Sequence, residues 1–137
     1  MKKLLPIMLT VISLSASATE DPLDCENAFT TIDMNRCAAI KRDAARVEME
    51  RYLNASLAHN AQDPELIEAI KQAQQDWEKY ADSHCKSVYT LWRDGTIRGV
   101  MGISCQIETL QQRTHDLWAN FLTYMDNTPA VLPEPKR

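Results

Sequence analysis

Four cysteines constrain the fold of this 137-residue chain more than any other feature: Cys25, Cys37, Cys85 and Cys105. An even number of cysteines in an exported chain predicts a disulfide framework. No two of them have the two-to-four-residue gap that is typical of structural zinc sites. Four cysteines allow three pairings. We favour Cys25 with Cys37 and Cys85 with Cys105, because each pair closes a short loop beside a predicted helix end.

The first 18 residues have the order of a secretory signal peptide. Met1-Lys2-Lys3 precedes an apolar run from Leu4 to Leu14, and small residues follow up to Ala18, after which we expect cleavage. The apolar run is shorter than the roughly 20 residues that span a bilayer. No cysteine lies at the cleavage point to accept a lipid. We therefore expect a periplasmic or secreted protein with no membrane anchor in its mature form.

The mature chain is acidic. Of 15 basic and 19 acidic residues, the signal peptide takes two lysines and no acid, so the net charge changes from −4 to −6 on cleavage. This charge argues against nucleic acid as a partner. An acidic surface speeds encounter with cationic proteins, although solubility also requires surface charge. The remaining length suits one domain, which we place at residues 19–126.

Three segments have the composition and spacing of helices. The first runs from Asn35 to His59 without Gly or Pro. The second begins at Asp63-Pro64-Glu65, where Asp is a preferred cap and Pro a preferred first residue. The third runs from about Cys105 to Met125. The apolar stripe of the second helix comprises Leu66, Ile70, Ala73, Trp77 and Tyr80, and His84 extends it.

The predicted fold is therefore all-α, a small disulfide-stabilised three-helix bundle with a glycine-rich loop between helices 2 and 3. Residues 127–137 contain three prolines and few residues that can pack, so we expect a disordered tail.

The predicted loop runs from Tyr89 to Gly102 and contains all three glycines of the chain. Glycine tolerates positive φ and close backbone approach, so the cluster predicts a shaped loop, which a Cys85–Cys105 disulfide would pin. Aromatic and arginine residues of this kind carry binding energy at interfaces. The candidate binding residues are Tyr89, Trp92, Arg93, Asp94, Gly95, Thr96 and Arg98. Alternatively, Trp92, Ile97 and Met101 fold back to cap the bundle.

No catalytic motif stands out in the sequence. A Gly-x-Ser-x-Gly nucleophile motif and a nucleotide-binding glycine pattern are both absent. His59, His84 and His115 are too scattered for a metal site, and the acid pairs on the helices are typical of solvated faces. We predict a binding protein with a protein partner, and no enzyme activity, cofactor or metal.

The four cysteines and a set of residues around them resemble the LprI-like lysozyme inhibitor domain family, whose members are small exported helical proteins of bacterial envelopes. The resemblance covers most of the mature chain. It rests on the four cysteines and on Thr30 or Thr31, Met34, Asp43, Tyr52, Trp77, Tyr80, Gly95-Thr96, Thr109, Arg113 and Leu117.

The resemblance implies binding and inhibition of lysozyme. Lysozymes act with two carboxylates in a cleft, which suggests that the loop occludes this cleft. In this hypothesis Arg93 and Arg98 reach the catalytic acids, while Trp92 and Tyr89 fill sugar subsites. The alternative is a periplasmic interaction or immunity-type protein that binds another envelope protein without catalysis. The sequence leaves the oligomeric state open.

Overall fold

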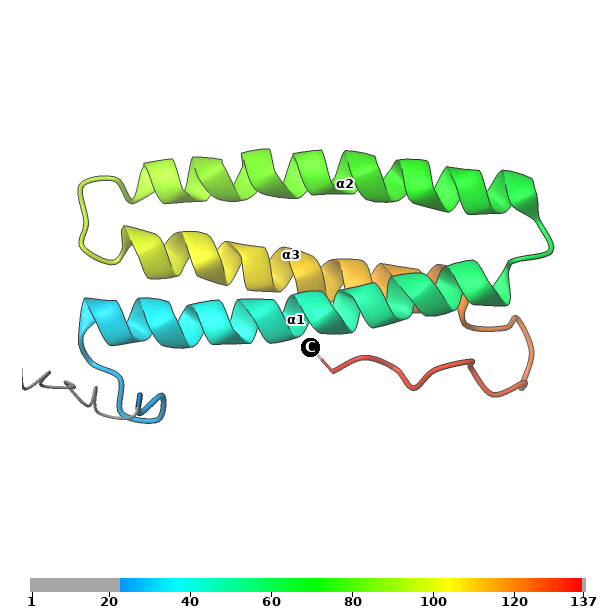
Figure 1. The fold of residues 1–137 in the computed structure, drawn as a ribbon, viewed down its shortest axis with the longest axis horizontal. Coiled ribbons are helices and arrows are strands. Elements are labelled where there is room, and N and C mark those ends of the chain that lie inside the picture. Colours follow the sequence, from blue (N-terminus) through cyan, green and yellow to red (C-terminus); the bar gives the residue numbers. More distant parts are fainter. Residues whose placement is uncertain (1–22, 137) are drawn as a thin grey trace, which may run out of the picture.

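The protein is a bundle of three α-helices, described here by a computed structural model over residues 23–136. The helices are α1 (Thr31–His59), α2 (Pro64–Leu91) and α3 (Arg98–Phe121). Both α1 and α2 pack mainly against α3 rather than against each other (Figure 1). This arrangement confirms the predicted all-α bundle. The expected signal peptide, residues 1–18, lies outside the described residues.

Two disulfides connect the elements. Cys25–Cys37 joins the segment before α1 to the second turn of that helix, and Cys85–Cys105 joins α2 to α3. The pairing is the one that the sequence favours. All four cysteines are consumed in these bonds. Within residues 23–136, no helix is both long and apolar enough to cross a membrane.

Side-chain caps fix the start of two helices. The Asp63 carboxylate accepts a hydrogen bond from the Leu66 backbone N–H at 3.0 Å, so α2 begins at Pro64 as predicted. The Thr30 hydroxyl oxygen likewise accepts from the Asp33 N–H at 3.1 Å. This cap starts α1 at Thr31, four residues before the predicted start at Asn35.

The third helix differs most from its prediction. It begins at Arg98 instead of Cys105 and ends at Phe121 instead of Met125. Gly99 and Gly102 are therefore helical, and no glycine of the chain has positive φ. The predicted loop from Tyr89 to Gly102 shrinks to six residues, Trp92–Ile97, because two of its glycines serve helix packing instead of a turn.

The core lies between α1 and α3. Its buried residues are Met49, Tyr52, Leu110, Leu117 and Leu122, with Trp77 and Trp118 packed beside them. Helix α2 follows the predicted stripe only in part: Ile70 is buried and Trp77 packs on the core. Gln74 and Cys85 are buried, whereas Ala73, Tyr80 and His84 are exposed. The predicted stripe is wrong at these positions because a hydrogen-bonded Gln74 occupies the inward face.

The C-terminal segment, residues 122–136, returns along the bundle (Figure 1). The Tyr52 hydroxyl donates to the Pro133 carbonyl at 2.6 Å, and the Trp118 indole N–H donates to the Leu132 carbonyl at 2.9 Å. Leu132 packs on the core and Pro135 is buried. This segment therefore differs from the disordered tail expected at 127–137, since aromatic donors on α1 and α3 bind its backbone.

Candidate functional site

The connection between α2 and α3 brings the candidate binding residues to one end of the bundle. Tyr89 lies in the last turn of α2 and Arg98 is the first residue of α3. Trp92, Arg93, Asp94, Gly95 and Thr96 lie between them in the short connection. Inside this turn the Gly95 N–H donates to the Trp92 carbonyl at 2.9 Å. The structure thus gathers all seven residues within a compact turn and its two flanking helix ends.

Apolar side chains in this turn remain in contact with solvent. Leu91 is 75% exposed, Trp92 37% and Ile97 38%. Trp92 and Ile97 are therefore only partly covered, so apolar surface as well as charge remains outside at this end of the bundle. The binding role of the turn stays a prediction.

The charged residues of the turn make few strong contacts. Arg93 has a side chain that is 65% exposed; its Nε lies 4.0 Å from an Asp94 carboxylate oxygen, and its Nη1 donates a hydrogen bond of 3.3 Å to the Thr90 carbonyl. The Arg98 guanidinium lies over the Tyr89 ring, 5.3 Å from its centroid, and donates a long hydrogen bond of 3.5 Å to the Arg93 carbonyl. These guanidinium groups are available to an acidic partner because their present contacts are weak.

The start of α1 lies at the same end of the bundle (Figure 1). Gly99 adjoins Asn35, whose side-chain oxygen would be 2.7 Å from a Cβ atom placed on the glycine. Two more large apolar residues, Phe29 and Ile32, are 84% and 71% exposed there. We call residues 29–32 together with residues 89–98 the loop end.

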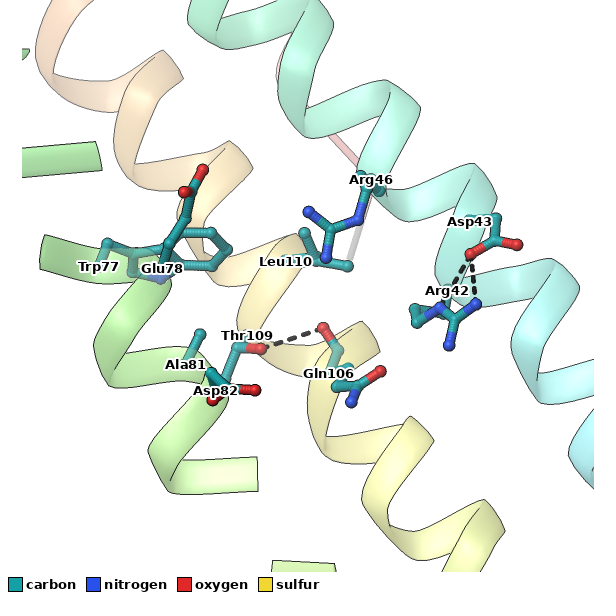
Figure 2. A pocket seen from close by; sticks show the side chains of 10 residues that line it. All are labelled: Arg42, Asp43, Arg46, Trp77, Glu78, Ala81, Asp82, Gln106, Thr109 and Leu110. Carbon is teal, nitrogen blue, oxygen red and sulfur yellow. Dashed lines mark hydrogen bonds and ion pairs between the residues drawn. The ribbon is translucent and has the colours of Figure 1, made fainter. Parts of the chain in front are cut away.

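A second candidate site is a groove between α1 and α2 whose floor is α3 (Figure 2). Its cavity volume is about 310 Å³, at the small end of the range for small-molecule sites. Polar and charged side chains make up most of its lining. The residues are Arg42, Asp43, Arg46, Trp77, Glu78, Ala81, Asp82, Gln106, Thr109 and Leu110.

The sequence reasoning missed this groove. Its lining comes from three helices that are distant in sequence, and on each helix the charges have the pattern of an ordinary solvated face. Asp43, Trp77 and Thr109 contribute to the family resemblance, but the sequence does not place them beside each other. Only the packing of α1 and α2 on α3 assembles them.

A buried polar network crosses the interior. Gln74 accepts a hydrogen bond from Arg113 Nε at 3.0 Å, and its amide nitrogen contacts Met49 Sδ at 3.6 Å and Glu78 Oε1 at 3.2 Å. Burial lowers the pKa of the Arg113 guanidinium. Since Glu78 also lines the groove, this network connects its acidic wall to the interior.

Comparison with known proteins gives the chain a family. Residues 25–117, which contain both disulfides, the turn and the groove lining, match the family described as lysozyme inhibitor LprI. An uncharacterized protein of Rhizobium meliloti (strain 1021) is 29% identical over 121 residues, covering 80% of this chain and 87% of the relative. No solved structure matches the chain. The chain belongs to the lysozyme inhibitor LprI family.

Proposed function

We propose that this protein is an exported envelope protein that binds lysozyme and inhibits it by placing the loop end across the enzyme's cleft. One observation carries the proposal within this family: the loop end combines exposed apolar side chains with two weakly held arginines. Aromatic and arginine residues dominate binding energy at protein interfaces. Its acidic mature chain also favours encounter with a cationic enzyme.

The two arginines have the chemistry that the cleft requires. Glycoside hydrolysis by lysozymes uses a pair of carboxyl groups, and guanidinium groups bind carboxylates through two parallel hydrogen bonds. Arg93 lies in the turn and Arg98 directly after it, and both can reorient because their side chains are exposed and their hydrogen bonds, of 3.3 and 3.5 Å to backbone carbonyls, are long. Either arginine can therefore pair with a catalytic carboxylate while Trp92 contacts the sugar subsites.

The framework behind the turn supports binding with little loss of conformational entropy. Cys85–Cys105 links α2 and α3 near the bases of the turn, with a Cα–Cα distance of 5.5 Å. Gly102 packs against Tyr89 between the same two helices. Rigid presentation of a binding segment raises affinity because less ordering is required on association.

The test is inhibition of lysozyme in a cell-wall turbidity assay with the mature protein. We expect near-stoichiometric inhibition of at least one lysozyme type. The double variant Arg93→Ala/Arg98→Ala should raise the inhibition constant by about tenfold or more, the effect of losing about 1.4 kcal/mol. A matched control is Arg51→Ala/Lys71→Ala, which removes the same charge from ion pairs with Glu48 and Glu68 elsewhere on the bundle.

The two parts of the proposal fail separately. Inhibition that survives in the Arg93→Ala/Arg98→Ala variant would exclude the loop end as the inhibitory surface. An absence of inhibition with every lysozyme type, together with capture of a single unrelated envelope protein, would favour the interaction or immunity-type alternative.

A further inference from the structure

We propose that the groove between α1 and α2 is a second binding site, for a small zwitterionic ligand of the amino-acid or short-peptide class. This site is separate from the loop end and does not depend on lysozyme binding. The inference starts from the charges of the two walls, which are opposite in sign and do not neutralise each other.

The α1 wall offers one available cation. Arg42 donates two hydrogen bonds to Asp43 Oδ1, at 2.8 and 2.6 Å, so the charges of these two neighbours offset each other. Arg46 has neither an ion pair within 4.0 Å nor a side-chain hydrogen bond to any residue in the described part of the chain. Figure 2 shows its guanidinium directed from α1 over Leu110 toward the opposite wall.

The α2 wall offers two carboxylates. Glu78 accepts one hydrogen bond from Gln74 at 3.2 Å through Oε1, which leaves its second oxygen available. Asp82 has no side-chain hydrogen bond or ion pair within residues 23–136. Since α1 and α2 pack on α3 rather than on each other, α3 holds the two charged walls apart. A ligand with a carboxylate at one end and an ammonium at the other would bridge them.

The floor of the groove suits a peptide backbone. Thr109 already donates its hydroxyl proton to the Cys105 or Gln106 carbonyl, both at 3.0 Å, so its oxygen acts as an acceptor. The Gln106 side-chain amide can both donate and accept. Trp77 and Leu110 add apolar surface between these polar groups. A few placed polar groups on an apolar base are typical of small-ligand sites.

The test uses L-alanyl-L-alanine as the probe, in a two-dimensional NMR titration of the mature protein. We expect shifts of the Trp77 indole N–H and of the Thr109 amide, with a dissociation constant of about 1 mM or below. The N-acetyl and the C-amide derivatives should each bind at least about tenfold more weakly, because each loses one charge that a wall recognises.

Variants assign each end of the ligand to a wall. Arg46→Gln should bind the free dipeptide and its C-amide equally well, since the partner of the carboxylate is gone. Asp82→Asn and Glu78→Gln should reduce the preference for the free amine over the N-acetyl form. Asp82→Asn provides the test if Glu78→Gln disturbs the Gln74 network. Arg51→Gln, a cation outside the groove, is the control and should keep both preferences.

Two results would overturn the proposal. One is an absence of shifts around the groove at dipeptide concentrations up to about 20 mM. A dissociation constant above this concentration would be too weak for specific recognition of both charged ends. The other is equal binding of the blocked and free dipeptides. If the first result is found, shifts of Trp77 caused by the neutral sugar N,N′-diacetylchitobiose would point to a carbohydrate site.

Discussion

At the scale of single residues, Gly102 sets the approach of α2 to α3. A Cβ atom at this position would lie 3.2–3.3 Å from Tyr89 side-chain carbons, including the Tyr89 Cβ. That Cβ is fixed to the α2 backbone and cannot rotate away. The glycine therefore permits this close approach, which a larger side chain would widen by a few tenths of an ångström, although glycine is usually unfavourable inside a helix.

We predict that Gly102→Val destabilises the protein by about 1–3 kcal/mol, because the larger side chain overpacks this contact. Urea unfolding followed by far-UV circular dichroism measures the change. Glu108→Val is the control, since this exposed position on the same helix reports only the small helix propensity of valine, about 0.5 kcal/mol. Equal stability of the two variants would show that the Gly102–Tyr89 contact does not determine the helix spacing.

The burial of Gln74 cannot be predicted from its residue type. A polar residue next to Ala73 gives no signal for burial, so an apolar stripe through Ala73 is the natural prediction. In the structure Gln74 is 5% exposed and satisfies its amide with Arg113, Met49 and Glu78. Burial of a polar side chain is tolerated when its hydrogen bonds are made. Arg113 and Met49 lie on other helices and are not recognisable from local spacing.

At the scale of elements, a local capping signal predicts the start of α2, and tertiary contacts override local composition at the start of α3. The Asp63-Pro64 signal places the start of α2 correctly, because capping is a contact within one turn. The start of α3 was predicted seven residues too late. Gly99 and Gly102 indicate a loop by composition, yet their small size fits them against Asn35 and Tyr89 inside the bundle.

The C-terminal segment is the element that the sequence describes least well. Its prolines and its net polarity indicate disorder, while its backbone carbonyls receive hydrogen bonds from the Tyr52 hydroxyl and the Trp118 indole. A further backbone bond joins the Val131 N–H to the Leu122 carbonyl at 2.8 Å. Such donors belong to distant parts of the chain, so composition does not reveal them.

We predict that deletion of residues 128–137 lowers the free energy of unfolding by about 2–4 kcal/mol, from three lost hydrogen bonds and the exposure of apolar core surface. Urea denaturation of the truncated and full mature chains measures this difference. Deletion of residues 136–137 alone should change stability little, because the hydrogen bonds at Leu132 and Pro133 remain. Unchanged stability on the longer deletion would contradict the packing described for this segment.

At the scale of the whole molecule, the bundle separates two kinds of surface. The loop end presents exposed apolar residues and arginines at one tip, and the groove presents opposite charges along the side between α1 and α2. The bundle and the approximate position of the turn follow from the sequence, because helix periodicity and turn composition are local. The favoured disulfide pairing, one of the three that four cysteines allow, is the one that the structure contains. The groove depends on how α1 and α2 share α3, which local patterns do not encode.

The most direct measurement of the central claim is amide hydrogen exchange of the mature protein, alone and in complex with lysozyme. We predict slower exchange in peptides that contain residues 89–98 and 29–32, with no change in the first half of α2, residues 64–76, at the opposite end of the bundle (Figure 1). Protection confined to other surfaces, with residues 89–98 unchanged in the complex, would contradict it.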